Sequence, residues 1–222
     1  MAQVASAPVR AFWLREYKEY PARFRAEAIA PIQNKVGAFL ANPLLYRILT
    51  HPPQALDLRR VMDDGSILLV NLAKGKIGED TAALLGSLLA GSLGAGALSR
   101  ADQTPEERRD FWLYLDEFHS FTTLSVATML SELRKYKVGF ALVHQYAAQL
   151  DEALQAAVSG NVGTILCFRV GAPDAEVLAP HFWPDLNAAD LTRLPNYRLY
   201  VRLLVDGKPT EPFSAETFGP NK

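Results

Sequence analysis

The central part of the chain alternates between short apolar runs and longer stretches with helical spacing. Four runs consist almost entirely of apolar residues, at 67–72, 111–115, 139–143 and 164–170. Such runs are typical of strands that are buried on both faces of a sheet. Helical spacing follows each run, at 79–99, 124–136, 149–158 and 174–182. This alternation predicts an α/β fold with a mostly parallel sheet flanked by helices on both sides.

The N-terminal part of the chain shows a different pattern. Residues 12–50 have helical spacing in two or three pieces, with breaks or first turns expected at Pro21, Pro31 and Pro43. Apolar residues recur there every three or four positions, which predicts one buried helical face. These residues are Ile29, Ile32, Val36, Phe39 and Leu40.

Charge also separates the N-terminal segment from the rest of the chain. Residues 1–60 carry nine Lys and Arg residues and four acids, whereas residues 61–222 have a net charge of −6. The basic excess is interpreted as a solvated helical face or as a contact with a polyanion. We therefore expect a basic helical segment at 1–60 and the main α/β body at 61–222.

The end of the chain carries a hairpin signal. Asp206-Gly207 separates two strand-like stretches at 197–205 and 210–213. An Asp-Gly pair suits the left-handed turn of a two-residue hairpin. We expect this hairpin to add an antiparallel edge to the sheet.

Composition limits the class of protein. The chain has 222 residues, of which 49% are hydrophobic and 10% aromatic, enough for a real core. Its single cysteine, Cys167, excludes an internal disulfide and a cysteine-based zinc site, and its apolar neighbours predict a buried thiol. The apolar stretch 82–98 is rich in Gly, Ser and Ala and is interpreted as a buried helix. No secretory signal is visible at the start, so we expect a cytoplasmic protein with no membrane span in this chain.

Polar side chains follow three of the predicted strands. Asp116-Glu117 comes after the second strand, His144-Gln145 after the third, and Arg169 lies at the end of the fourth. Ligands of open α/β sheets bind at the carboxyl ends of strands. These side chains provide the groups that phosphoryl transfer needs. One acid can bind magnesium and the other can orient water, the amide can contact a phosphate, and the guanidinium supplies positive charge. The acids could equally cap a following turn.

Several segments together resemble the HerA/FtsK superfamily of P-loop ATPases. Tyr114-Leu115-Asp116-Glu117 has the Walker B form, in which the catalytic acid follows the metal-binding acid. The resemblance is strongest to the conjugative coupling ATPases and the related type IV secretion DNA-transfer family, and it spans about residues 12–213. Further matching segments lie at 71–79, 116–121, 130–136, 144–150, 160–164 and 168–171.

The resemblance implies a RecA-like ATPase core in a hexameric ring motor that moves DNA using ATP and Mg²⁺ and serves a secretion system. Carried over by position, Asp116 matches the magnesium-binding acid and Glu117 the catalytic carboxylate. Gln145 matches the residue that senses the terminal phosphate. Arg134 matches an arginine that reaches the neighbouring subunit's nucleotide, and Arg169 is a second candidate for that role.

One departure from the family affects the expected activity. A phosphate loop needs the pattern G-x-x-x-x-G-K-[ST]. Gly75-Lys76 is followed by Ile77 and Gly207-Lys208 by Pro209, so neither pair fits. We therefore expect the C-terminal half of an ATPase core, which binds ATP weakly or not at all by itself. Its sheet should lack the Walker A strand beside the strand that leads to Gln145.

Two other interpretations remain open. The chain could be a non-catalytic binding or assembly module that has kept the ATPase fold. A metal-dependent nuclease that uses Asp116 and Glu117 would need further acids nearby, and Asp110 and Glu132 are not obviously placed for it. The four histidines show no metal-ligand spacing.

Overall fold

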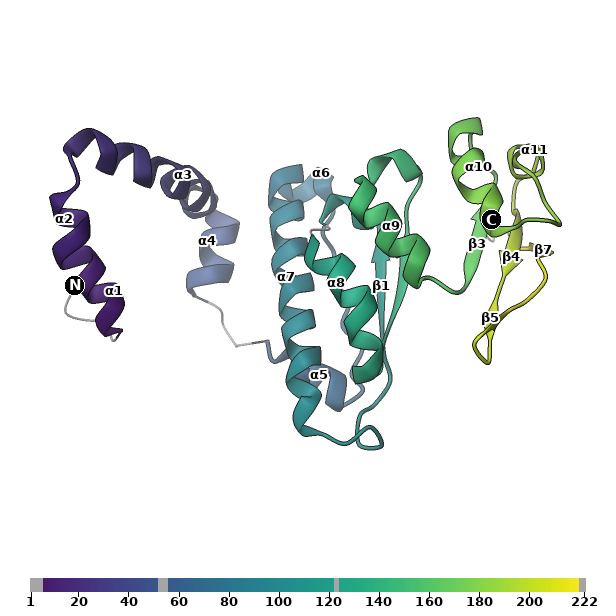
Figure 1. The fold of residues 1–222 in the computed structure, drawn as a ribbon, viewed down its shortest axis with the longest axis horizontal. Coiled ribbons are helices and arrows are strands. Elements are labelled where there is room, and N and C mark those ends of the chain that lie inside the picture. The colour runs from purple at the N-terminus through teal and green to yellow at the C-terminus, as the bar shows by residue number, and fades with distance from the viewer. Residues whose placement is uncertain (1–5, 52–55, 122–123, 220–222) are drawn as a thin grey trace. The chain divides into compact units, whose positions relative to one another are not determined.

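The computed structural model describes residues 6–51, 56–121 and 124–219. The chain divides into two compact units, Met1–Leu56 and Asp57–Lys222, which are considered separately below. Figure 1 shows the helices and strands of both units.

The first unit is a series of helices. They are α1 (Ala7–Ala11), the π-helical turn η1 (Phe12–Glu16), α2 (Tyr17–Glu19), α3 (Ala22–Ala41) and α4 (Pro43–Thr50). The predicted helical pattern is confirmed, with Pro21 and Pro43 at helix boundaries, whereas Pro31 lies inside α3. Asn42 begins α4, because its side chain accepts hydrogen bonds from the backbone N–H groups of Leu44 and Leu45.

The buried helical face predicted for α3 is not present within this unit. Ile32 is 62% exposed, and Val36 and Leu40 are also exposed. An amphipathic helix buries its apolar stripe only against a second layer, and α4 alone does not provide one. The side chain of Phe39 lies outside the described part of the structure.

The second unit is built on two parallel strands. Strand β1 (Phe111–Asp116) pairs with β2 (Val138–Val143), so that Phe111 lies opposite Val138 and Asp116 opposite Val143. The surrounding helices are α5 (Leu58–Asp63), α7 (Glu79–Ser99), η2 (Arg100–Asp102), α8 (Leu124–Glu132), η4 (Leu133–Tyr136) and α9 (Glu152–Asn161). Parallel strands with helical crossovers confirm the predicted α/β class.

The core lies on one face of this strand pair. Leu113, Leu115 and Phe140 pack against apolar side chains from α7, α8 and α9. On the opposite face Trp112 is 59% and Tyr114 74% exposed. The sequence predicts strands covered on both faces, and in the described part of the chain this is correct for one face only.

Helix α7 has the predicted bounds and is packed through small residues. A Cβ atom added to Gly86 would lie 2.7 Å from the ring of Phe121, so only glycine allows this close approach. By length and composition α7 could cross a membrane, a test that core helices also pass. Its buried residues include Leu93 and Ala97, which belong to the main apolar cluster. The prediction of a core helix agrees with this packing.

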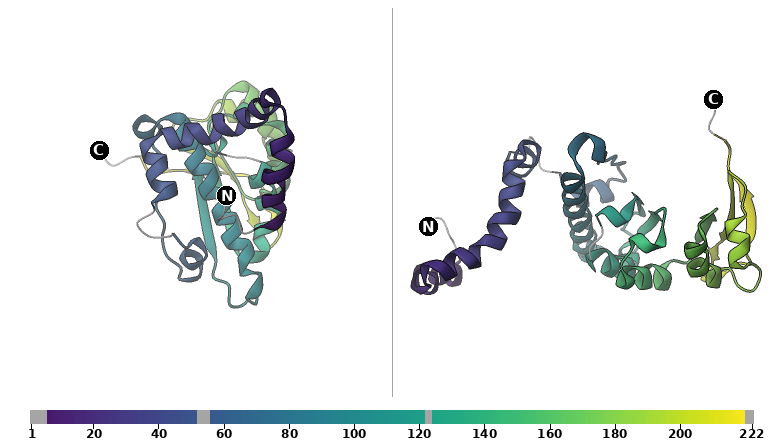
Figure 2. Two further views of the ribbon diagram at one scale, coloured as in Figure 1. Left: turned by 90° about the vertical axis from the view of Figure 1, so that its left-hand side faces the viewer. Right: turned by 90° about the horizontal axis from the view of Figure 1, so that it is seen from above.

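The C-terminal part forms an antiparallel sheet. Strand β3 (Ile165–Phe168) pairs with β4 (Arg198–Arg202), which pairs with β7 (Phe213–Glu216). The fourth predicted strand is therefore present, but its partner is antiparallel, and it is not hydrogen-bonded to β1 or β2. Helices α10 (Ala172–Leu178), η6 (Ala179–His181) and α11 (Ala188–Thr192) pack on this sheet (Figures 1 and 2).

Two further predictions in this region are confirmed. Strands β5 (Leu204–Val205) and β6 (Lys208–Pro209) form the expected hairpin, with φ angles of 50° at Asp206 and 74° at Gly207. The hairpin is a two-stranded sheet of its own, so the expectation that it extends the parallel sheet is wrong. Cys167 is buried in the core of the sheet, at 3% exposure. The hairpin follows from turn chemistry and the buried thiol from apolar neighbours, both of which are local.

The first predicted strand, at 67–72, is not formed. This segment makes no ladder with any described residue and leads into the short helix α6 (Lys74–Ile77). Ile67 and Leu69 are 89% and 90% exposed, so the prediction of a strand buried on both faces is wrong for the described structure. A strand exists only through pairing, and no described segment pairs with this one.

Candidate functional site

The two acids lie at the carboxyl end of β1. Asp116 is the last residue of the strand and is exposed, while Glu117 is partly exposed. Glu117 has a φ angle of 52° in the left-handed region, where a non-glycine residue is strained. The next residue, Phe118, begins the 3-10 turn η3 (Phe118–Ser120) and is fully buried. This buried ring fixes the chain directly after the two carboxylates.

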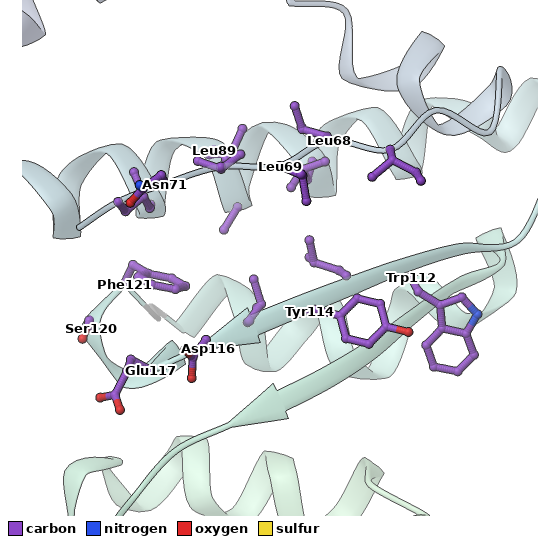
Figure 3. A pocket seen from close by; sticks show the side chains of 18 of the residues that line it. Leu68, Leu69, Asn71, Leu89, Trp112, Tyr114, Asp116, Glu117, Ser120 and Phe121 are labelled. Atoms are coloured by element: carbon purple, nitrogen blue, oxygen red, sulfur yellow. The ribbon is translucent and has the colours of Figure 1, made fainter. Parts of the chain in front are cut away.

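Gln145 reaches the same place from the neighbouring strand. Its Nε2 donates a hydrogen bond of 2.6 Å to Oε1 of Glu117. The parallel register that pairs Asp116 with Val143 brings both strand ends to one edge, and Gln145 follows β2 by two residues. The 3-10 turn η5 (Ala147–Gln149) comes directly afterwards. Figure 3 shows Asp116, Glu117 and Ser120 together at one end of a pocket.

His119 is a contact of Glu117 that sequence reasoning did not assign. Its Nε2 lies 3.6 Å from Oε2 of Glu117, and its side chain is 16% exposed. The ring of His144 stacks edge-on against Phe118, with centroids 5.4 Å apart. The Nδ1 atoms of both histidines are buried without a partner among the described residues. A histidine two positions after the second acid was the available signal in the sequence.

Arg134 lies at the other end of the strand pair. It belongs to η4, which ends just before β2 begins. The six residues of each strand separate the two edges by about 17 Å at about 3.3 Å per residue. Arg134 lies before the start of β2 and Glu117 lies after the end of β1, so the two residues are remote within one chain. The side chain of Arg134 is exposed.

Arg169 directly follows β3, in the antiparallel sheet. Its Nη2 donates a 3.0 Å hydrogen bond to Oδ1 of Asn196. The structure does not place it beside Glu117, although the following helix is close to the Gln145 segment. There the backbone N–H of Ala147 donates a 2.8 Å hydrogen bond to Oδ1 of the buried Asp174.

The acids fit one kind of metal site. Among the described residues no group of three or more His, Cys, Asp or Glu side chains could hold an ion. Mg²⁺ commonly uses one or two protein carboxylates and takes its other ligands from water and substrate phosphates. The exposed carboxylate of Asp116 is suited to that role, whereas an ion held by protein side chains alone does not fit.

The basic residues around α6 do not form a phosphate cradle. Lys74 Nζ lies 3.6 Å from Oε1 of Glu79, an acid in the first turn of α7. The carboxylates of Glu79 and Asp80 already offset the positive end of that helix.

Comparison with known proteins identifies the fold. No protein-family model and no curated protein matches the chain. Among solved structures, plasmid coupling protein TrwB with ADP and Mg²⁺ has a TM-score of 0.67 at 14% identity, covering 96% of this chain and 55% of that chain. TrwB with the non-hydrolysable GTP analogue GDPNP has a TM-score of 0.66 at 15% identity, with the same coverage.

A further form agrees with these two. A bacterial conjugative coupling protein, TrwBdeltaN70 in an unbound form, has a TM-score of 0.64 at 15% identity, covering 93% of this chain and 54% of that chain. The chain thus spans about half the length of these structures. The parallel β1–β2 pair, its helices and the C-terminal strands have a fold similar to that of the coupling protein TrwB.

Proposed function

We propose that this chain supplies the water-activating part of an ATPase that moves DNA. The observation that carries the proposal is the hydrogen bond between Gln145 and Glu117 at the carboxyl end of parallel strands. A carboxylate held by an amide from the next strand is a suitable arrangement for orienting water and sensing a phosphate. The coupling-protein fold and the nucleotides bound by TrwB support the same class of reaction.

Each residue has a distinct role in this proposal. Oε1 of Glu117 is held by Gln145, so its Oε2 is the oxygen that can accept a proton from an attacking water. Asp116 would hold Mg²⁺, which shields the phosphate charge when it is bound. Gln145 would contact the terminal phosphate or the same water. His119, beside Oε2 of Glu117, would position that carboxylate.

The arginines are assigned to neighbouring subunits. Arg134 lies at the N-terminal end of the strand pair and Glu117 at its C-terminal end, so Arg134 cannot reach a nucleotide bound at Glu117 of the same chain. In a closed head-to-tail ring one surface of each subunit faces a different surface of the next. We propose that Arg134, or Arg169 as the second candidate, completes the charge at the next subunit's site. The proposal includes a hexameric ring, DNA as the cargo, a secretion system as partner and a cytoplasmic location.

A second candidate function has its own observation. Trp112 and Tyr114 expose a large apolar surface, and the sequence has no phosphate loop. Both features also suit a non-catalytic assembly module that binds another protein through this face.

DNA-stimulated ATP hydrolysis tests the proposal in the natural polypeptide that contains residues 1–222. Glu117→Gln should lower the turnover rate by about 10²–10⁴-fold while nucleotide binding persists. The matched control is Asp110→Asn, which changes an acid just before β1, at the opposite strand end. A Glu117→Gln protein with an unchanged rate would contradict the role of Glu117, and no hydrolysis by the unmodified protein would favour the assembly module.

A further inference from the structure

The backbone of Ala147 is held by side chains from two different helices. Its N–H donates a 2.8 Å hydrogen bond to Oδ1 of Asp174, in the first turn of α10. Its carbonyl oxygen accepts a 2.7 Å hydrogen bond from Nε2 of Gln155 in α9, and the same Nε2 donates to the carbonyl oxygen of Leu150 at 3.0 Å. The N–H and the carbonyl group of this one residue are therefore both fixed by side chains from elsewhere in the chain.

These bonds fix the turn that follows Gln145. Ala147 comes two residues after Gln145 and begins η5, and its side chain is buried. Gln145 itself is exposed, so packing contributes little to keeping its Nε2 at 2.6 Å from Oε1 of Glu117. The backbone that carries this amide is held on one side by β2 and on the other by the turn at Ala147.

Asp174 is a buried acid, with 8% of its surface exposed. Burial of a carboxylate is costly unless it accepts hydrogen bonds. A bond from an N–H group to a carboxylate is charge-assisted and stronger than one between neutral groups. An apolar side chain in place of Asp174 would leave the N–H of Ala147 without this acceptor. The hold on the turn after Gln145 thus offsets part of the cost of burying the acid.

Asp174 is also anchored to the C-terminal sheet. The next residue, Ala175, is fully buried in a cluster with Cys167 of β3 and with Phe182. The first turn of α10 is thereby fixed on the antiparallel sheet, and its carboxylate provides a rigid support for Ala147.

We propose that Asp174 is a positioning residue, which holds Gln145 against Glu117 through the backbone of Ala147. This inference rests on the proposed function, in which Glu117 and Gln145 act on the attacking water. Asp174 acts through the backbone and not on the nucleotide, and Gln155 supports the same residue from its other side. A displacement of about 1 Å that begins far from the chemistry can cost about 10²-fold in rate.

The side-chain amide of Gln145 reports its own position without any ATP hydrolysis. In the ¹⁵N-labelled chain of 222 residues, Glu117→Ala removes the acceptor and gives the NMR chemical shifts of a released Gln145 amide. Asp174→Ala should move the Gln145 amide resonances at least halfway to those shifts. Asp174→Asn keeps an oxygen acceptor at the same place and should leave the resonances close to those of the unmodified chain.

Asp190→Ala is the matched control. It removes another acid of the C-terminal part, one that accepts a 2.9 Å hydrogen bond from the backbone N–H of Asn187 at the start of α11. This variant should leave the Gln145 amide resonances unmoved. Equal movement in Asp190→Ala and Asp174→Ala would indicate general loosening of this part of the chain and would overturn the proposal.

Unmoved Gln145 resonances in a folded Asp174→Ala chain would overturn it directly. If Asp174→Ala does not fold, Gln155→Met provides the decisive measurement, because it releases Ala147 from the other side with a side chain of similar size. Gln155→Met should move the Gln145 resonances toward their released positions. Unmoved resonances in that variant would show that the turn at Ala147 does not hold Gln145.

Turnover of the natural polypeptide that contains residues 1–222 separates this inference from the proposed function. Asp174→Ala should lower kcat by up to about 10²-fold with little change in the KM for ATP, and Asp174→Asn should retain most of the rate. Added to Gln145→Ala, Asp174→Ala should cause no further loss. An unchanged kcat in Asp174→Ala beside a slow Glu117→Gln protein would overturn this inference alone. An unchanged rate in Glu117→Gln would instead contradict the proposed function.

Discussion

Gln145 donates a hydrogen bond of 2.6 Å to Glu117 across the ends of two neighbouring parallel strands, and Glu117 receives it in a left-handed backbone conformation. A non-glycine residue in that region is strained by about 1–2 kcal/mol. The buried Phe118 and the turn that follows maintain the strained conformation. Strain of this kind concentrates at functional sites, where geometry is favoured over stability.

Replacing Glu117 by glycine should therefore relieve strain. We expect Glu117→Gly to leave the free energy of unfolding unchanged or to raise it by up to about 1 kcal/mol, after loss of the exposed hydrogen bond to Gln145. Asp116→Gly is the control, because a glycine within β1 should lower stability by about 1 kcal/mol. Urea unfolding of the 222-residue chain measures both, and equal destabilisation by the two variants would argue against strain at Glu117.

Arg100 should be a major stabilising residue of the second unit. Its side chain is fully buried, its Nε lies 3.0 Å from Oδ1 of Asp63, and its guanidinium donates to the carbonyl oxygens of Tyr136 and Arg109. Arg100→Met would remove the buried guanidinium with its ion pair to Asp63 and its hydrogen bonds to the two carbonyl oxygens, so it should lower the free energy of unfolding by about 3 kcal/mol.

The control for Arg100 is an exposed ion pair in the same region. Arg60 Nε lies 3.2 Å from Oδ2 of Asp64, four residues later on an exposed surface. Arg60→Met should change the free energy of unfolding by about 0.5 kcal/mol or less. Urea unfolding monitored by circular dichroism compares the two variants, and similar effects would show that burial of Arg100 contributes little.

The thiol of Cys167 should be unreactive in the folded chain. Burial raises the pKa of Cys167 to about 11, and the nearby negative charge of Asp174 acts in the same direction. At pH 8 the thiolate population is about 100-fold below that of an ordinary thiol with a pKa of 9.0. Alkylation by iodoacetamide should accelerate as the pH rises toward 11 and after unfolding in urea. Rapid labelling of the folded chain at pH 8, followed by mass spectrometry, would contradict the burial.

Local signals in the sequence predicted most elements of the second unit. Acids at the start of α7 and its helical spacing give its bounds, and Asp206-Gly207 gives the hairpin, because capping and turn chemistry depend on adjacent residues. The site was also predictable in part. Residues that end neighbouring parallel strands must lie at one edge, so Glu117 and Gln145 could be expected together.

Features that depend on distant partners were not predictable in this way. An apolar run such as 67–72 becomes a strand only if another segment pairs with it, and β3 acquired an antiparallel neighbour, β4, from 30 residues further along the chain. The apolar stripe of α3 likewise predicts burial without specifying what covers it. His119 was missed because its role depends on the turn after β1, which brings its ring to Glu117.

A double-mutant cycle on single-turnover ATP hydrolysis tests the central claim most directly. The proteins are the natural polypeptide containing residues 1–222 and its Glu117→Gln, Gln145→Ala and doubly substituted forms. If Glu117 and Gln145 act as one unit on the attacking water, the double variant should be about as slow as Glu117→Gln alone, about 10²–10⁴-fold below the unmodified protein. Fully multiplicative losses, or an unchanged rate in Glu117→Gln, would contradict the account.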